Sequence, residues 1–107
     1  MLKRTGPAVD VYRAIADPTR RAILDKLVAG ALPVNKLAAD FDQSRPAISK
    51  HLRVLRRARL VKEQKRGREM HYELWATPLG EVTHWLEPYR QFWQTSLVNL
   101  KRHLERR

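Results

Sequence analysis

Cysteine is absent from the 107-residue sequence, which excludes disulfides, thiolate metal sites and thiol nucleophiles. No stretch of about 18 apolar residues occurs, so no membrane-spanning helix is expected. The basic start of the chain, Met1–Arg4, is not followed by an apolar run, so no signal peptide is expected either. A Gly-rich phosphate loop and a Ser, His and Asp order typical of hydrolases are also missing. These absences favour a protein of the reducing cytoplasm that is not an enzyme.

Acidic residues are scarce, with 11 Asp and Glu against 22 Lys and Arg, which gives a net charge of +11. Ten basic residues lie between Arg45 and Arg68, where Glu63 is the single acid. A folded domain this basic usually meets a polyanion, either nucleic acid or an anionic membrane surface. A charge that serves only solubility would be spread more evenly along the chain, so this concentration favours a binding face.

Four helices are predicted in the first half of the chain, and capping residues mark their limits. Asp17 is a good N-cap, and Pro18 fits the first helical position after it. Ser44 is a second N-cap, with Pro46 in the first turn that follows. Gly30 is placed to end the second helix in a left-handed conformation. The predicted helices cover residues 7–16, 18–29, 34–41 and 45–58.

A β-hairpin is predicted directly after the fourth helix. Residues 60–64 and 69–75 have the composition of strands, and Gly67 lies among polar residues between them. Upstream, residues 31–33 are interpreted as a turn between the second and third helices. The first half of the chain and the hairpin therefore give the order helix, helix, helix, helix, strand, strand.

A long C-terminal helix is predicted from the apolar spacing that continues to the end of the chain. Thr77 is interpreted as its N-cap, with Pro78 in the first turn. Pro88 interrupts the spacing, and a proline inside a helix costs about 3 kcal/mol. We therefore expect a kink or a break near residues 84–87. The complete order, α-α-α-α-β-β-α, is that of a mainly helical fold with a small β-hairpin wing (α+β), a winged helix-turn-helix.

The fourth helix presents two different faces. One stripe is apolar and the other is basic, with a small serine within it. A helix fits the major groove of B-DNA, about 12 Å wide, where Arg can bind guanine with two hydrogen bonds. The apolar stripe consists of Ile48, Leu52 and Leu55, and the basic stripe of Arg45, Ser49, Arg53 and Arg56.

The hairpin that follows supports a role of this helix in DNA binding. Alone, the basic stripe could equally be the solvated face of an ordinary amphipathic helix. However, Arg66 and Arg68 flank Gly67 at the predicted hairpin tip, where they could reach the minor groove or phosphates. A recognition helix and a charged wing together predict a double-stranded DNA site. Its expected residues are Lys36, Gln43, Ser44, Arg45, Ala47, Ser49, Lys50, His51, Arg53, Arg66 and Arg68.

The C-terminal helix is too apolar for a helix exposed on its own, since its apolar residues span more than one stripe. In a chain this short, one core cannot easily cover both sides, and aromatic-rich patches mark interfaces. The alternative is that these residues close the core of the same subunit. We favour a homodimer, built by Tyr12, Trp85, Tyr89, Phe92, Trp93, Leu97, Leu100 and Leu104.

A two-fold dimer places its recognition helices about 34–36 Å apart, which predicts an inverted-repeat operator. The domain organisation expected from these elements is a single winged helix-turn-helix domain over residues 1–107. Residues 7–76 form its DNA-binding core, and residues 77–106 form the C-terminal dimerisation helix.

Three segments of the chain resemble the ArsR/SmtB family. They are Asp17-Pro18-Thr19-Arg20-Arg21-Ala22-Ile23-Leu24, then Ser44-Arg45-Pro46-Ala47-Ile48-Ser49-Lys50-His51-Leu52-Arg53-Val54-Leu55, then Leu60-Val61 with the Gly67 wing ending in His71-Tyr72-Glu73-Leu74. The resemblance covers roughly residues 8–105 and implies a dimeric repressor that occupies an operator and is released by an effector. The segment from Trp85 to Trp93 resembles the autorepressor-like branch of the family, which senses no metal.

The chain departs from the family pattern at two places. Metal-sensing members carry Cys-x-Cys in the third-helix region, where this chain has Pro33-Val34-Asn35, so thiolate-type metal sensing is excluded there. Arg59 stands where the family usually has glycine after the recognition helix. An arginine in left-handed geometry costs about 1 kcal/mol. Either the helix ends differently here, or the added charge at the DNA face offsets that cost.

A metal site elsewhere in the chain is not expected. Glu81 and His84 share one helical face and could form half a site, but the spacing that family members use for zinc or nickel is absent. No cofactor is expected, and the existence and chemistry of a small-molecule effector are left open.

Two other kinds of function use the same charge. A non-specific, chromatin-like architectural protein would bind DNA without needing the small residues of the recognition face. A basic amphipathic helix on an anionic membrane is the second alternative. The charge lies on the fourth helix and the hairpin, apart from the aromatic C-terminal helix, which argues against membrane binding. Sequence-specific regulation of transcription is therefore the favoured interpretation.

Overall fold

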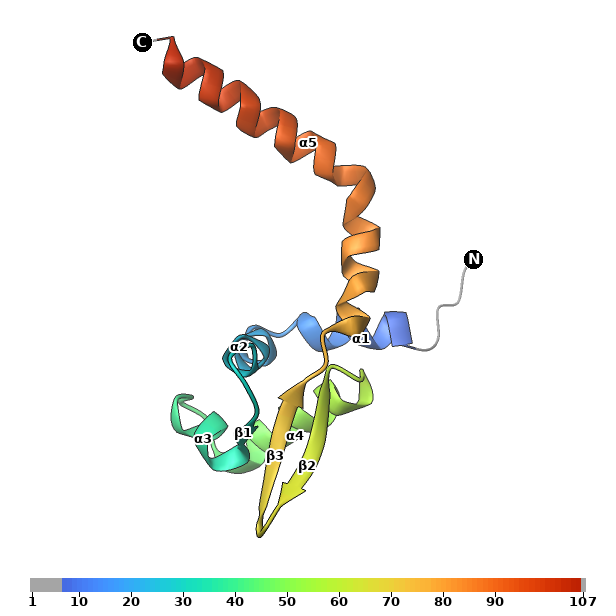
Figure 1. Ribbon diagram of the computed structural model, residues 1–107, viewed down its shortest axis with the longest axis vertical. Helices are drawn as coiled ribbons and strands as arrows, with labels where there is room; N and C mark the ends of the chain where they lie inside the picture. Colours follow the sequence, from blue (N-terminus) through green and yellow to red (C-terminus); the bar gives the residue numbers. More distant parts are fainter. Residues whose placement is uncertain (1–6, 107) are drawn as a thin grey trace.

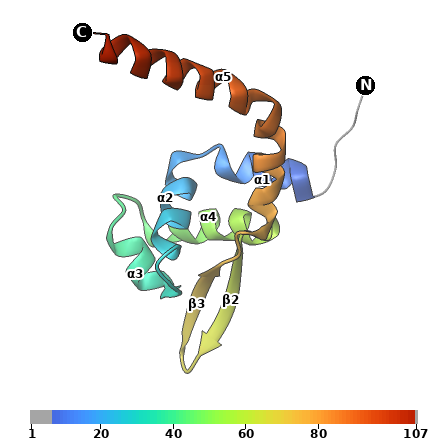
Figure 2. The same ribbon diagram turned by 45° about the horizontal axis from the view of Figure 1, so that its top comes forward.

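The computed structural model describes residues 7–106, a mainly helical fold with a small antiparallel β-hairpin, as the sequence predicts. The helices and hairpin form one body, from which the last helix extends (Figures 1 and 2). In chain order the elements are α1 (Pro7–Ile15), α2 (Pro18–Leu27), β1 (Leu32–Pro33), α3 (Val34–Ala39), α4 (Arg45–Arg57), β2 (Val61–Arg66), β3 (Glu69–Leu74), the 3-10 turn η1 (Thr77–Leu79) and α5 (Gly80–Glu105).

Two predicted helix starts are confirmed by their hydrogen bonds. The Asp17 carboxylate accepts from the backbone N–H of Arg20 at 3.0 Å, and Pro18 begins α2. The Ser44 hydroxyl accepts from the N–H of Ala47 at 3.3 Å. Each of the four helices ends one or two residues before its predicted limit, because terminal turns lack full backbone pairing. Gly30 has a positive φ of 148° after α2, but outside the left-handed helical range that was predicted.

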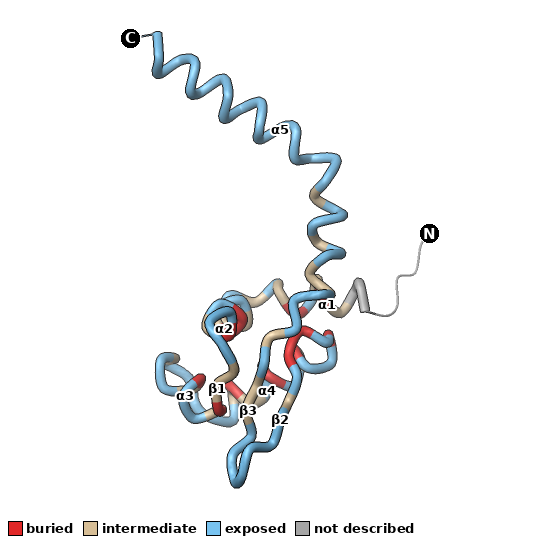
Figure 3. Tube along the Cα trace, viewed as in Figure 1, coloured by how far each residue is buried: buried red, intermediate tan, exposed pale blue. Residues whose placement is uncertain are grey.

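The apolar stripe of α4 lies at the centre of the core. Ile48, Leu52 and Leu55 are at most 1% exposed, which confirms the prediction that this stripe turns inward. Figure 3 shows that the buried residues gather where α1, α2, α3 and α4 meet the base of the hairpin. The other members of the core cluster are Ala14, Ile23, Leu24, Leu27, Leu37, Ala58, Leu60 and Val61.

The hairpin belongs to a three-stranded antiparallel sheet with the order β1-β3-β2. Strands β2 and β3 pair from Val61 opposite Leu74 to Arg66 opposite Glu69, and Gly67 has a φ of 62° at the tip. The predicted turn at residues 31–33 is wrong in part, because Leu32 belongs to strand β1 and pairs with Tyr72 of β3. A strand of two residues shows no alternation that a sequence pattern could reveal.

The start of α5 also differs from the prediction. Thr77 does not cap α5 with its side chain but is the first residue of η1. In this 3-10 turn, the backbone N–H of Leu79 donates to the carbonyl of Ala76 at 2.8 Å. Helix α5 then runs without a break through Pro88 to Glu105. Figure 1 shows that it bends part-way along, which fits a proline that lacks an N–H and crowds the preceding turn.

Arg59 has a left-handed backbone with a φ of 62°, the only positive φ among the described residues that are not glycine. The N–H of Leu60 donates to the carbonyl of Leu55 at 3.0 Å, and the N–H of Arg59 donates to the carbonyl of Arg56 at 3.0 Å. These two bonds form a Schellman motif, which normally uses glycine at this position. The helix therefore ends in the geometry typical of glycine, with an arginine in that place.

Arg59→Gly is expected to raise the free energy of unfolding by about 1 kcal/mol, because glycine adopts this φ without strain. The loss of one positive charge at the end of α4 should weaken DNA binding slightly. Urea unfolding of both proteins measures the first effect, and a salt-matched DNA titration measures the second. Arg57→Gly, at the last residue of α4, removes the same charge where the backbone is helical; it is the control and should lower stability rather than raise it. Lower stability of the Arg59→Gly variant would contradict the claim that the left-handed backbone at Arg59 is strained.

Candidate nucleic-acid interface

The face of α4 opposite the core is basic and open. Arg45, Lys50 and Arg53 are exposed, whereas the small residues Ala47 and Ser49 are half-buried between them. This arrangement follows from the apolar stripe, because burial of Ile48, Leu52 and Leu55 fixes the opposite side of the helix outward. Lys36 on α3 and the N-cap Ser44 are also exposed. A helix face with small residues between cations allows close approach to a groove of DNA.

The hairpin carries the second basic group. Arg66 ends β2 and Arg68 follows Gly67 at the tip, and both are exposed. Arg66 donates from Nη2 to Oε1 of Gln64 at 3.4 Å, which leaves its other donors unused among the described residues. Figures 1 and 2 show the hairpin projecting from the body on the side away from the end of α5. The structure thus places a cationic wing beside α4.

Glu63, the only acid of the basic segment, joins the two parts of this surface. Its carboxylate forms an ion pair with Arg56 of α4 and accepts a 3.4 Å hydrogen bond from the hydroxyl of Tyr72. The side chain is therefore shared between α4 and both strands of the hairpin. Its isolation among ten basic residues was the signal that could have revealed this role.

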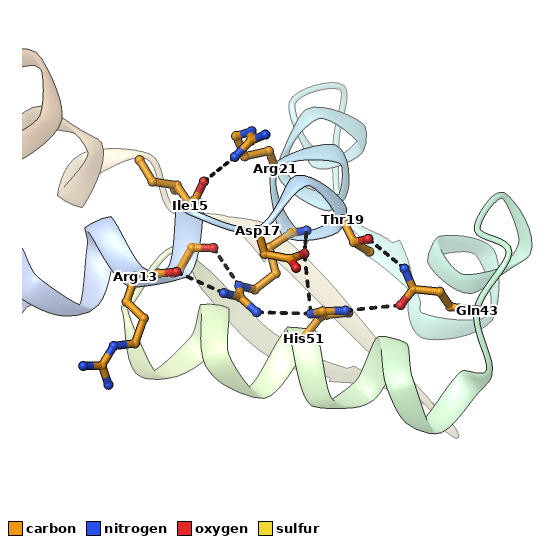
Figure 4. Close-up of polar contacts among 9 residues, drawn as sticks. Arg13, Ile15, Asp17, Thr19, Arg21, Gln43 and His51 are labelled. Carbon is orange, nitrogen blue, oxygen red and sulfur yellow. Dashed lines mark hydrogen bonds and ion pairs between the residues drawn. The ribbon is translucent and has the colours of Figure 1, made fainter.

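Gln43 and His51, two of the expected DNA contacts, take part in a polar network within the subunit (Figure 4). Nε2 of His51 lies 3.2 Å from Oε1 of Gln43, and Nε2 of Gln43 donates to Oγ1 of Thr19 at 2.7 Å. Nη1 of Arg20 lies 3.3 Å from Nδ1 of His51. Because Arg can only donate, Nδ1 accepts, and this assigns the proton of the neutral ring to Nε2.

Arg20 links this network to the end of α1. It donates from Nε to the carbonyl of Ala14 at 2.7 Å and from Nη2 to the carbonyl of Arg13 at 3.0 Å. These carbonyls belong to the last turn of α1, and that of Arg13 also accepts from the backbone N–H of Ala16 at 3.3 Å. One side chain therefore fixes the end of α1, the start of α2 and the middle of α4 relative to one another. Sequence patterns missed Arg20, because its partner His51 is 31 positions away.

Asp17 is the acid of this network. The hydrogen bond from the backbone N–H of Arg20 is the main cause that lowers the pKa of the Asp17 carboxyl, while burial opposes it and the charge of Arg20 adds to it. Oδ2 of Asp17 lies 3.9 Å from Nδ1 of His51. A lowered pKa means that the ionised carboxylate stabilises the fold.

Asp17→Asn should keep the cap but remove the pH dependence that the carboxylate brings. Because the pKa of Asp17 in the folded protein is below the usual value of 3.8, the contribution of the charge is present above that value and is lost as the pH falls below it. Urea unfolding at pH 7 and at pH 3 measures how the stability of each protein depends on pH. The native protein should exceed the variant in stability at pH 7, and this difference should shrink at pH 3. An equal difference at both values would contradict the role of the charge.

The expected dimer residues lie on α5 and on the part of α1 next to it. The hydroxyl of Tyr12 donates to the carbonyl of Glu81 at 3.1 Å, and its ring meets Trp85 edge to face at 6.0 Å between centroids. Beyond this contact α5 leaves the body, and Figure 3 shows it as exposed except for short intermediate stretches near its start. The large apolar side chains exposed on α5 are Trp85, Tyr89, Phe92, Trp93, Leu97, Val98, Leu100 and Leu104.

Metal-binding clusters and membrane-spanning helices are both absent from the described part of the chain. Within residues 7–106, no group of three or more His, Asp or Glu side chains is arranged to hold a metal ion. None of the helices in the same range is both long and apolar enough to cross a membrane.

Several known proteins are similar to this chain in sequence and in fold. A family model described as a helix-turn-helix domain matches residues 15–64. The chain is 38% identical over 77 residues to the transcriptional repressor SdpR of Bacillus subtilis, a match that covers 72% of this chain and 86% of the relative. It is 43% identical over 87 residues to the HTH-type transcriptional regulator Rv2034 of Mycobacterium tuberculosis, a match that covers 81% of this chain and 78% of the relative.

A solved structure agrees with these matches. The crystal structure of the ArsR family transcriptional regulator RHA00566 superposes with a TM-score of 0.73 at 31% identity, over 83% of this chain and 98% of the other. The helix-turn-helix model covers the region from the end of α1 to β2, which contains α4 and the polar network. The family resemblance noted in the sequence is thereby confirmed: the chain belongs to the ArsR family of helix-turn-helix transcriptional regulators.

Proposed function

We propose that the protein is a repressor that binds an inverted-repeat DNA operator as a homodimer. The observation that carries the proposal is the division of α4 into a buried apolar stripe and an exposed basic stripe. Membership of the family supports DNA-binding regulation, and SdpR is named a repressor. The operator, the dimer and the roles of single residues are our own inferences.

The base-reading residues would come from the first two turns of α4. Arg45, Ser49 and Lys50 lie near the helix N-terminus, the end that usually reaches base edges, and Arg53 lies one turn further. Ala47 lets the backbone approach closely, and the N-cap Ser44 and Lys36 would contact phosphates. These residues remain DNA contacts in the proposal.

Gln43 and His51 would act differently from the other expected contacts. Their polar atoms are used by Thr19 and Arg20 within the subunit. We therefore assign to them the positioning of α4 rather than the reading of bases.

Arg66 and Arg68 would bind the backbone or the minor groove beside the site read by α4. A cation at a hairpin tip attracts any duplex, because the phosphates carry no sequence information. The wing would therefore raise affinity for all DNA, whereas α4 would distinguish one sequence from another. This division predicts different responses to substitution in the two elements.

The dimer would form through the apolar face of α5, together with Tyr12 of α1. An exposed face with two tryptophans, a tyrosine and a phenylalanine on one projecting helix marks an interface. A second copy of the same chain supplies a matching face by symmetry. Two recognition helices about 34–36 Å apart would then occupy successive major grooves.

The proposed regulator uses neither a thiolate metal site nor an enzyme activity. The chain has no cysteine, and Pro33, Val34 and Asn35 stand in the region where the family places its thiolates. On this ground we assign the protein to the branch that does not sense metals, with no resident cofactor.

Selection of bound fragments from a random DNA pool tests the proposed function. The expected result is an imperfect inverted repeat with half-sites about 10 base pairs apart, centre to centre. In competition, the selected sequence should bind about 10³ times more tightly than random DNA of the same length at the same salt concentration. Enrichment of no sequence, with equal binding of all competitors, would instead indicate an architectural protein.

A further inference from the structure

A mainly apolar cavity of about 650 Å³ opens at the base of the hairpin, where five parts of the fold meet. We call it the wing-root cavity. Helix α1, the end of α4, the start of β2, the segment after β3 and the start of α5 all contribute to its lining. Its apolar walls include Val11, Val61, Trp75 and Pro78. Its volume lies within the range of roughly 300–1,000 Å³ that is usual for small-molecule pockets.

The charged residues of the lining are mostly positive. Lys62 extends over Trp75, with its Nζ 3.1 Å from the ring centroid, and Arg59 lies at the strained end of α4. Among residues 7–106, neither Arg59 nor Lys62 forms an ion pair, whereas Arg56 is paired with Glu63. Glu81 is the single acid of the lining. An apolar chamber with two cations that have no carboxylate partner is complementary to an apolar molecule with one negative charge.

We propose that the wing-root cavity binds an apolar monocarboxylate, which acts as the effector of this regulator. The acyl or aryl body would lie against Trp75, Val61 and Pro78, and the carboxylate would accept from Lys62 and Arg59. No covalent step is involved. The regulatory part of the proposal rests on the proposed function, whereas the binding part does not.

The position of the cavity explains how a bound carboxylate would change DNA binding. The lining joins the last turn of α4 to the start of β2 and to the start of α5. A ligand there would contact the recognition helix, the wing and the dimer helix at once. Since the carboxylate would also neutralise cations beside the DNA face, we expect it to weaken operator binding. By linkage, the operator would weaken carboxylate binding by the same factor.

Calorimetric titration of the full chain, without DNA, tests the binding part with three probes of equal length. Octanoate should bind with one molecule per subunit. The neutral octan-1-ol and the cationic octylammonium should bind about tenfold more weakly or not at all, because each lacks the charge-assisted hydrogen bonds. Octanol binding as tightly as octanoate, or no binding of octanoate, would overturn the proposal.

Matched variants locate the site. Lys62→Met keeps the aliphatic stem over Trp75 but removes the charge, so the preference for octanoate over octanol should fall about tenfold. Gly80→Phe should block octanoate, because a Cβ at Gly80 meets no atom within 4 Å and the larger side chain has open space at the cavity wall. Lys65→Met, on the same strand but outside the lining, is the control and should bind octanoate as the native chain does. Unchanged octanoate binding by both Lys62→Met and Gly80→Phe, with melting temperatures like that of the native chain, would overturn the site.

The regulatory part is tested separately on the selected operator. Saturating octanoate should weaken operator binding by the native chain and leave binding by the Gly80→Phe variant unchanged. If octanoate binds but operator affinity does not change, the effector role is wrong although the cavity is a binding site. Failure of the proposed function itself would show in the DNA selection, which contains no carboxylate.

Discussion

Trp93→Glu is expected to give a folded monomer that binds the selected operator at least about 100-fold more weakly than the native chain. Trp93 is 43% exposed on α5, which leaves the body of the subunit, so the substitution disturbs no core packing. It would place a charge in the centre of the proposed α5 interface. In a dimer, binding of the first half-site makes the second binding event intramolecular, and this advantage is lost with the monomer.

Sedimentation velocity measures the oligomeric state of this variant, and fluorescence anisotropy measures its DNA affinity. Gln91→Glu is the matched control, because Gln91 lies on the opposite side of α5 and is also exposed. The control should remain dimeric. A native chain that sediments as a monomer at the concentrations that bind DNA would contradict the proposed dimer, as would a Trp93→Glu variant that stays dimeric.

Arg20→Met is expected to lower the free energy of unfolding by about 2–3 kcal/mol. Arg20 donates to two carbonyls at the end of α1 and to His51 of α4, and methionine can replace none of these bonds. The variant would remove the Arg20 donor from the carbonyl of Ala14 and from Nδ1 of His51 in a partly buried place, which costs more than the mean value of a hydrogen bond. His51 and Gln43 would also lose their fixed orientation, so discrimination between operator and random DNA should fall.

Arg21→Met provides the control for this prediction, since the two arginines are neighbours on α2. Arg21 makes one hydrogen bond, from Nη1 to the carbonyl of Ile15 at 2.8 Å, and is exposed. Its replacement should lower the free energy of unfolding by less than about 1 kcal/mol. Urea unfolding compares the two variants. Equal effects would mean that the link to His51 contributes nothing beyond the capping of α1.

The parts of the fold that the sequence predicts are those whose signals are local. The N-caps Asp17 and Ser44 act on amides three residues away, and the stripe of Ile48, Leu52 and Leu55 repeats within one helix. The left-handed geometry at Arg59 combines a local helix end with a family pattern, which is why the sequence offered it as one of two alternatives. These features are fixed by backbone chemistry over a few residues.

The parts that sequence patterns missed depend on the tertiary fold. Strand β1 exists only because β3 pairs with it, and its two residues are too few to show the alternation of a strand. Gln43 and His51 have the side chains of DNA contacts, and only the approach of Thr19 and Arg20 gives them partners within the subunit. The wing-root cavity likewise needs residues from α1, α4, β2, the segment after β3 and α5. In each case the information lies in the arrangement of the elements rather than in any one of them.

Binding of Arg53→Ala and Arg66→Ala to the selected operator and to random DNA, at several salt concentrations, tests the central claim most directly. Arg53→Ala, on the exposed stripe of α4, should weaken operator binding by about 1–3 kcal/mol, affect random DNA less and blur preference at one base position. Arg66→Ala, on the wing, should weaken both DNAs alike and flatten the salt dependence. If Arg53→Ala instead weakens both DNAs equally, α4 does not read the sequence, and the proposed division of roles between α4 and the wing is wrong.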